Sequence, residues 1–238
     1  MNNKLHIFRT PAEVISNYAA FFVEKAKESI LEKGKFTVVL SGGNSPKSVF
    51  ELLAKDYAHA LDWSSVYFFF GDERFVPSND PEYNGLMAKE ALFNPLNIQG
   101  NQIFTVDTSL DVKAAAADYA KKIVQFFDGE DAVFDLVMLG LGDDAHTASL
   151  FPNTEVLIEE FATISHVFIE EKGVFRITMT AQMINDAQNI AFLVFGANKA
   201  EAIEHVLKGE RNTTLYPAQL IDKKAVWFTD DAAAKLVS

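Results

Sequence analysis

The sequence predicts an α/β fold, with three layers (α/β/α) around a doubly wound, mainly parallel sheet. Two observations predict it. Short apolar runs alternate with segments of helical periodicity along the whole chain. The apolar runs also lack alternating polar residues, a pattern typical of strands that helices cover on both faces. Since the chain has no internal repeat and no low-complexity linker, we expect residues 1–238 to form a single domain.

Short runs of β-branched, aromatic and aliphatic residues predict the strands. The five clearest runs are Phe36–Leu40, Val66–Phe70, Phe134–Leu139, Ile190–Phe195 and Ala225–Phe228. Two further runs, Leu5–Phe8 and the less apolar Ile103–Val106, predict additional strands.

Four segments between these runs predict helices. Thr10 and Pro11 form a cap–proline start for the first helix, and Gly34 predicts its end. Ser45 and Pro46 repeat the cap–proline start for a second helix. The strand–helix alternation corresponds to a modified Rossmann-like arrangement, in which ligands bind beyond the carboxyl ends of the strands. The two remaining predicted helices are Ala114–Phe127 and Asn198–Leu207.

Composition excludes several kinds of chemistry. The chain has no cysteine, which excludes disulfides, thiolate zinc sites, iron–sulfur clusters and a cysteine nucleophile. With 21 basic and 33 acidic residues, the formal net charge is −12, which disfavours a nucleic-acid partner. No signal-peptide core and no apolar run of about 20 residues is present. We therefore expect a soluble cytoplasmic protein without a membrane partner.

The first strand-end loop is rich in glycine. Ser41, Gly42, Gly43 and Asn44 follow the run Phe36–Leu40 and lead into the second predicted helix. Two glycines let the backbone turn tightly, and the unpaired N–H groups at a helix start favour an anion. The loop predicts either a phosphate or carboxylate site or a plain strand-to-helix turn.

The second strand-end loop contains one of only four arginines in the chain. Asp72, Glu73 and Arg74 follow the run Val66–Phe70 after a single glycine. Arg74 could bind an anionic oxygen, while the acids hold it or contact sugar hydroxyls. The alternative is a local salt bridge at a turn.

Two further cations are candidates for the same site. Lys199 falls in the first turn of a predicted helix, where a cation is unfavourable unless an anion lies beside it. Arg176 interrupts an apolar stretch and could point to the same place.

The third strand-end loop carries a histidine. His146 follows two glycines, and histidine, with a reference pKa of about 6.5, suits general base catalysis at neutral pH. Asp144 could accept a hydrogen bond from the far ring nitrogen and fix the tautomer. Two alternatives are a metal site and a helix cap formed by Asp143 or Asp144. Because no second histidine lies at a ligand-like spacing, we expect neither a metal nor another cofactor. Together the loops predict hydrolysis or proton transfer on a phosphorylated metabolite.

These motifs resemble, in order and spacing, the glucosamine-6-phosphate isomerase/6-phosphogluconolactonase family, and within it the lactonases. The resemblance covers nearly the whole chain. It rests on residues 41–46, 71–77, 139–152, 176–180, 184–185, 196–200 and 225–227.

Two positions favour the lactonases over the deaminases of this family. Phe151 stands where the deaminases have a glutamate that supports ring opening, and Arg74 matches the lactonases. One position departs from the family, which usually has glycine between the aspartate and the histidine. Here that residue is Ala145, which would be strained if its φ were positive.

The resemblance implies hydrolysis of 6-phosphoglucono-δ-lactone to 6-phosphogluconate in the oxidative pentose phosphate pathway, by a monomer. His146 would activate water, and Asp144 would orient His146. Backbone N–H groups of either glycine loop would stabilise the oxyanion. The alternatives are a glucosamine-6-phosphate deaminase or isomerase, a non-catalytic sugar-phosphate-binding domain, and an inactive paralogue. The residues expected to bind substrate are Ser41, Gly42, Gly43, Asn44, Asp72, Arg74, Arg176 and Lys199.

Overall fold

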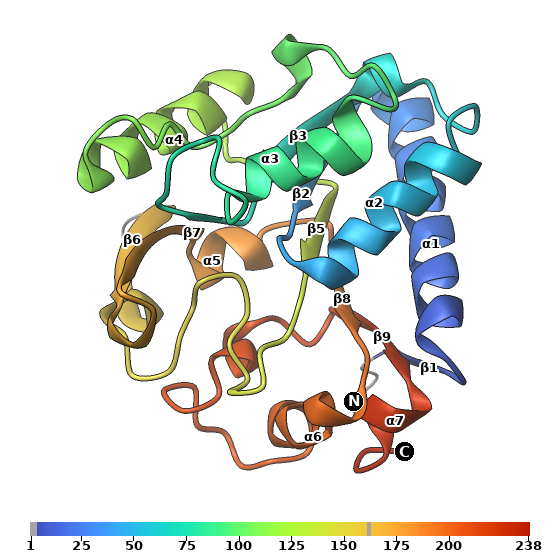
Figure 1. Ribbon diagram of the computed structural model, residues 1–238, viewed down its shortest axis with the longest axis vertical. Helices are drawn as coiled ribbons and strands as arrows, with labels where there is room; N and C mark the ends of the chain where they lie inside the picture. Colours follow the sequence, from blue (N-terminus) through green and yellow to red (C-terminus); the bar gives the residue numbers. More distant parts are fainter. Residues whose placement is uncertain (1–3, 161–162) are drawn as a thin grey trace.

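Six parallel strands form the central sheet of the computed structural model, which describes residues 4–160 and 163–238 (Figure 1). Their order is β1-β9-β8-β5-β2-β3. The five clearest apolar runs and the further run Leu5–Phe8 are confirmed as strands, with ends shifted by at most two residues. The strands are β1 (Lys4–Phe8), β2 (Phe36–Leu40), β3 (Val66–Phe70), β5 (Leu136–Leu139), β8 (Asn189–Val194) and β9 (Val226–Asp230).

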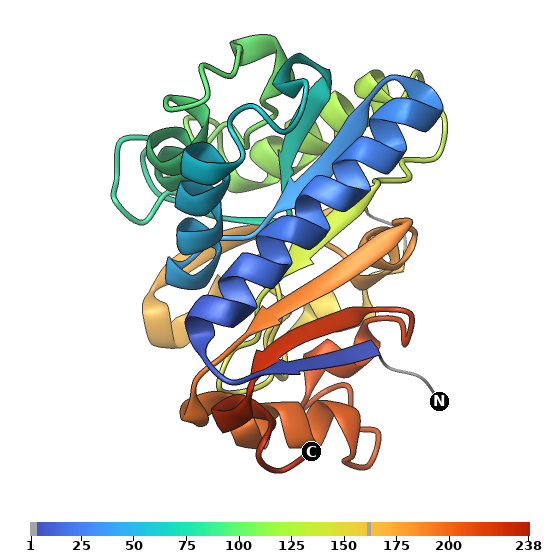
Figure 2. The same ribbon diagram turned by 90° about the vertical axis from the view of Figure 1, so that its right-hand side faces the viewer.

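Helices cover both faces of this sheet, which confirms the three-layer arrangement. One face packs on α1 (Pro11–Lys33) and α2 (Asn44–Asp56), the other on α4 (Val112–Phe126) and α6 (Ala200–Leu207) (Figures 1 and 2). The short helices are α3 (Asn84–Ala88), α5 (Ala181–Asn185), α7 (Asp231–Ala234), the π-helical turn η2 (Lys89–Phe93), and the 3-10 turns η1 (Trp63–Ser65), η3 (Gly100–Gln102), η4 (Glu155–Ile158), η5 (Glu170–Lys172), η6 (Ala197–Lys199) and η7 (Pro217–Leu220).

The caps of α1 are those that the sequence predicts. The Thr10 hydroxyl accepts a hydrogen bond from the backbone N–H of Glu13. Gly34 ends the helix with φ +75°, and its N–H donates to the carbonyl of Ile30. No helix within the described residues is long and apolar enough to cross a membrane.

Three details of the sequence prediction are wrong. Ile103 forms one isolated bridge with Phe68 instead of beginning a strand, because the next residue, Phe104, stacks on Phe69 and covers the sheet. Helix α2 begins at Asn44, one residue before the predicted cap Ser45, because the N-cap is Gly43 with φ +99°. The predicted helix 198–207 is split, since 3-10 turn η6 precedes α6.

A second, antiparallel sheet was not predicted from the sequence. It has the order β4-β7-β6 and lies beside α4 (Figure 1). Arg176 lies in the middle of β7 and breaks the apolar pattern that would have identified this strand. Only Gly71 separates β3 from β4, so the chain passes directly from one sheet to the other. The strands are β4 (Asp72–Arg74), β6 (Ile164–Ile169) and β7 (Val174–Met179).

Candidate active site

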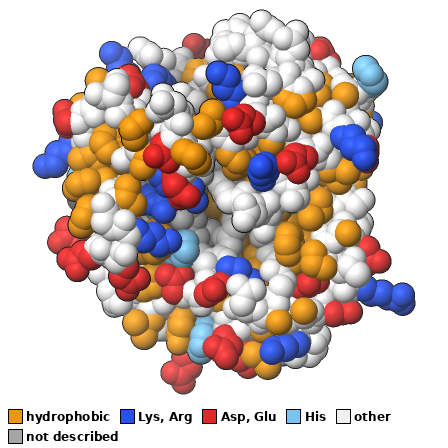
Figure 3. Space-filling view, in the orientation of Figure 1, with side chains coloured by type: hydrophobic (Ala, Val, Ile, Leu, Met, Phe, Trp, Pro, Cys, Tyr) orange, Lys and Arg blue, Asp and Glu red, His pale blue; other side chains and the backbone are white. Residues whose placement is uncertain are grey.

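The carboxyl ends of β2 and β5 lie next to each other at the point where the winding of the sheet reverses. From β2 the chain moves outward to β3, and from β5 it moves in the other direction to β8 and β9. Such a switch point is the usual ligand site of a doubly wound sheet. A cavity of about 210 Å³ lies there, lined by the loops that follow both strands. Figure 3 shows a hollow in the middle of this face, with Lys, Arg and His side chains around it.

The cavity brings together most of the residues singled out from the sequence, although they are far apart along the chain. Asp144 is paired with His146 but lines a different hollow. Gly43 and Asn44 do not line the cavity either, because the chain turns at Gly43 into α2. Phe151 and Lys172 line it without having been predicted as site residues. The predicted residues that line it are Ser41, Gly42, Asp72, Arg74, His146, Arg176 and Lys199.

His146 and Asp144 form a hydrogen-bonded pair. The imidazole Nδ1 lies 2.5 Å from Asp144 Oδ1, and the His146 backbone N–H donates to the same oxygen at 3.2 Å. Partial burial acts to raise the pKa of Asp144, but the hydrogen bonds and charge of His146 outweigh it and hold that pKa below its ordinary value. Since Nδ1 faces the carboxylate, Nε2 is the nitrogen left for a ligand.

The helix-cap interpretation of this loop is wrong. No helix begins at residues 143–146, so the carboxylates are not helix caps. Within the described residues, no three His, Asp or Glu side chains cluster in the manner of a metal site.

The loop that carries His146 is held in an unusual backbone conformation. Ala145 has φ +61°, so the strain expected for alanine at this position is present. The N–H of Gly142 donates to the carbonyl of His146 at 2.8 Å, and the N–H of Ala218 donates to the carbonyl of Ala145 at 3.0 Å. A Cβ atom on Gly142 would overlap the imidazole ring and the Asp144 carboxylate, so this close approach requires glycine.

Arg74 and Arg176 lie opposite each other on β4 and β7. Each has a buried Nε that has no hydrogen-bond partner within the described residues. Arg74 donates to the carbonyl of Glu82 at 2.8 Å and pairs with the Glu82 carboxylate at 3.4 Å. The local salt bridge with Asp72 or Glu73, the alternative for this loop, is therefore not formed by Arg74. Arg176 is only 6% exposed, and its Nη1 lies 4.0 Å from Asp72. Burial lowers the pKa of Arg176, and the charge of Arg74 acts in the same direction.

The two acids before Arg74 have separate partners. Asp72 accepts a hydrogen bond of 2.6 Å from the Ser149 hydroxyl. Glu73 is 1% exposed, and its carboxylate accepts the backbone N–H groups of Arg74, Asn84 and Gly85. Burial raises the pKa of Glu73 to about 8, against the effect of these three donors. Glu73 thus ties the start of α3 to β4 and is not a cavity residue.

Lys199 is paired with a carboxylate of the protein itself, so its position does not require a bound anion. Its Nζ lies 2.5 Å from Asp143 Oδ1, and Asn198 donates to the same oxygen at 3.0 Å. The hydrogen bond from Lys199 holds the pKa of Asp143 below its ordinary value. Lys199 ends η6 and precedes the first residue of α6.

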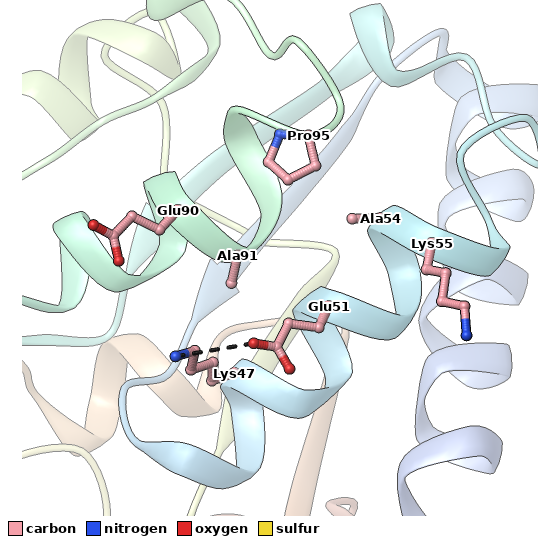
Figure 4. A pocket seen from close by; sticks show the side chains of 7 residues that line it. All are labelled: Lys47, Glu51, Ala54, Lys55, Glu90, Ala91 and Pro95. Atoms are coloured by element: carbon pink, nitrogen blue, oxygen red, sulfur yellow. Dashed lines mark ion pairs between the residues drawn. The ribbon is translucent and has the colours of Figure 1, made fainter.

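A different hollow lies between α2 and η2. Lys47 and Glu51 form an ion pair of 3.9 Å at its wall (Figure 4). It contains no histidine and lies on the helical layer, away from the switch point. The His146–Asp144 pair and the two arginines with buried Nε atoms therefore mark the switch-point cavity as the candidate active site.

Residues 9–229 match the family model described as glucosamine-6-phosphate isomerases/6-phosphogluconolactonase. The chain belongs to this family. A 6-phosphogluconolactonase of Nostoc sp. is 35% identical over the full length of both chains. A solved 6-phosphogluconolactonase from Trypanosoma cruzi has a TM-score of 0.89 at 26% identity, covering 100% of this chain and 97% of that one.

The fold is shared more widely within the glucosamine-6-phosphate isomerase/6-phosphogluconolactonase family. A monomeric glucosamine-6-phosphate deaminase has a TM-score of 0.82 at 20% identity, covering 98% of this chain and 99% of that one. The doubly wound sheet thus does not by itself separate the two activities of the family, which differ in the side chains of the site.

Proposed function

We propose that the chain hydrolyses 6-phosphoglucono-δ-lactone to 6-phosphogluconate, a step of the oxidative pentose phosphate pathway. The observation that carries the proposal is one cavity lined by His146, which Asp144 orients, and by two arginines whose buried Nε atoms have no partner among the described residues. The pair suits proton transfer, and the arginines suit a phosphate. The names of the similar proteins support the same substrate.

His146 is the proposed general base. Its Nε2 removes a proton from a water molecule, whose oxygen attacks the lactone carbonyl while Asp144 stabilises the imidazolium. The imidazolium then gives this proton to the ring oxygen as the C–O bond breaks. A lactone is an activated ester, so the proposal includes no covalent intermediate and no cofactor.

The oxyanion donors are assigned to the loop after β2. In the loop after β5, the N–H of Gly142 already donates to the carbonyl of His146, and neither Asp143 nor Asp144 lines the cavity. The N–H groups of Gly42, Gly43 and Asn44 have no acceptor among the described residues, and Gly42 lines the cavity. Preorganised donors of this kind stabilise the charge that develops on a carbonyl oxygen.

The phosphate is assigned to Arg74 and Arg176. Their Nε atoms offer hydrogen bonds that no described residue of the chain accepts. Lys199 is a secondary ligand in this proposal, because Asp143 already neutralises its charge. Ser41 and Asp72 are left to contact hydroxyl groups of the sugar.

Phe151 supports the lactonase over the deaminase. It places an apolar ring against His146, where the deaminases of the family have a carboxylate. A non-catalytic sugar-phosphate-binding domain would not need the His–Asp pair. It stays a prediction that the chain forms a single domain, is a cytoplasmic monomer and binds neither membranes nor nucleic acids. Light scattering tests whether it is a monomer.

The deciding experiment is a coupled assay with freshly generated 6-phosphogluconolactone, run beside an ammonia-release assay with glucosamine 6-phosphate. The spontaneous hydrolysis of the lactone is subtracted. We expect lactone hydrolysis and no ammonia. Ammonia release without lactone hydrolysis would establish the deaminase instead, and neither activity would favour the binding domain.

A further inference from the structure

The imidazole of His146 is packed against an aromatic ring within the cavity. The ring centroids of His146 and Phe151 lie 4.0 Å apart, and the two planes are inclined by 21°. Phe151 is 8% exposed, so the stack covers one face of the imidazole and keeps water from it. Stacked aromatic pairs stabilise a structure by more than the burial of their apolar area alone.

The hydrogen bond to Asp144 does not by itself fix the imidazole. It holds Nδ1 near Oδ1 but leaves the ring able to turn about the line between these atoms. Such a turn would move Nε2 away from the position where a water molecule meets the lactone. A misplacement of about 1 Å can reduce a rate by about 100-fold, so the plane of the ring matters as much as its hydrogen bond.

Phe151 is itself held firmly by the loop. The Thr147 hydroxyl donates to the carbonyl of Gly140 at 2.8 Å, and the N–H of Leu150 donates to the carbonyl of Thr147 at 2.9 Å. The Thr154 hydroxyl then donates to the carbonyl of Phe151 at 2.7 Å. These bonds close a tight turn between the histidine and the phenylalanine, so the aromatic ring is a fixed surface for the imidazole.

We propose that Phe151 is a positioning residue for His146. Its ring fixes the plane of the imidazole, Asp144 fixes Nδ1, and together they direct Nε2 into the cavity. This inference rests on the proposed function, because it gives Phe151 a part in the reaction that His146 performs.

The test compares Phe151→Leu with Phe151→Tyr in steady-state kinetics. Leucine removes the aromatic face, and we expect kcat to fall by about tenfold or more while KM stays within about twofold. Tyrosine keeps the ring, and we expect it to retain kcat within about threefold. If Phe151→Leu does not fold, Phe151→Met takes its place, since methionine fills the space without an aromatic face.

Phe192→Leu is the matched control. Phe192 is also buried and stacked, with its ring centroid 3.8 Å from that of Trp227, but it lies outside the active-site cavity. We expect this variant to lose stability and keep kcat. An equal loss of kcat in the Phe192 and Phe151 variants would show a general packing effect and overturn the proposal.

A proton NMR measurement tests the stack independently of activity. The ring of Phe151 shields the carbon-bound protons of the imidazole, whose resonances are assigned by their loss in His146→Gln. We expect these resonances to move downfield in Phe151→Leu and to stay in place in Phe151→Tyr. No movement, an unchanged kcat, or a loss confined to KM would refute the positioning role. A wild-type chain without lactonase activity would refute the proposed function, while the NMR result would still decide the stack.

Discussion

Arg74 and Arg176 are direct register partners across the antiparallel pair β4–β7. Like charges opposite each other destabilise a sheet. Asp72, 4.0 Å from Arg176, and Glu82, 3.4 Å from Arg74, offset part of this repulsion. Neither arginine Nε has a hydrogen-bond partner in the part of the chain that the structure describes. A dianionic phosphate between the guanidinium groups would satisfy both Nε atoms and offset the repulsion between the two arginines.

Arg74→Gln should weaken the binding of 6-phosphogluconate by about 10- to 100-fold, because it removes charged hydrogen bonds to the phosphate. The inhibition constant of this product measures the effect. Arg211→Gln is the matched control, since Arg211 is exposed and outside the cavity. Lys199→Ala should weaken binding less than Arg74→Gln, because Asp143 already pairs with Lys199. Equal inhibition constants for the Arg74 and Arg211 variants would rule out the phosphate assignment.

His146→Gln should lower kcat by about 100- to 10,000-fold with a small change in KM, because glutamine cannot accept the proton of water. Asp144→Asn should lower kcat in the same direction, since it no longer favours the tautomer with a free Nε2. The coupled lactone assay measures both, with the spontaneous rate subtracted. A His146→Gln variant at the parental rate would exclude His146 as the base.

Gly142→Ala should lower kcat by about tenfold or more, because the new methyl group would displace the imidazole and the carboxylate of the pair. Gly140→Ala is the matched control in the same loop. Its nearest contact would be Ser41 Oγ at 3.9 Å, so kcat should change little. The prediction fails if both variants keep the parental kcat.

Ala145→Gly should raise the free energy of unfolding by about 0.5 to 1 kcal/mol, because it relieves a left-handed φ of +61° at some cost in chain entropy. Urea denaturation measures the change. Ala202→Gly, inside α6, should instead lower the free energy of unfolding by about 1 kcal/mol. Destabilisation by both substitutions would show that the strain at Ala145 is negligible.

Glu73 should make the stability of the protein depend on pH. Its pKa is raised by burial to about 8 from an ordinary value of 4.5. Between these values the folded state binds more protons than the unfolded state, so the stability contributed by this group is complete below about 4.5 and is lost as the pH rises through about 8.

Glu73→Gln removes this titration but also replaces one acceptor oxygen of the carboxylate by an amide donor. We expect the variant to be less stable than the parent at about pH 6 and this deficit to shrink by about pH 9. Urea denaturation across that range measures it, with the exposed Glu51→Gln as control. A deficit that is constant with pH would contradict the raised pKa of Glu73.

The sequence identified the central sheet and its loops because their signals are local. An apolar run such as Val66–Phe70 is a strand wherever it is buried, and Thr10 and Gly34 cap α1 with their own atoms. The second sheet gave no such signal, because Arg176 interrupts β7 and β4 has only three residues. Lys172 was missed because it ends the turn between β6 and β7, two strands of the sheet that the sequence did not predict.

The sequence by itself determined the His146–Asp144 pair, since two residues of separation already place the carboxylate within reach of Nδ1. Only the tertiary structure decided that Arg74 faces Arg176, because strand register joins segments about one hundred residues apart. It also decided the contact of Phe151 with His146, which depends on how the loop folds back on itself. Hydrogen bonding and propensity act between near neighbours and are readable from the sequence, whereas packing and register exist only once the whole sheet has formed.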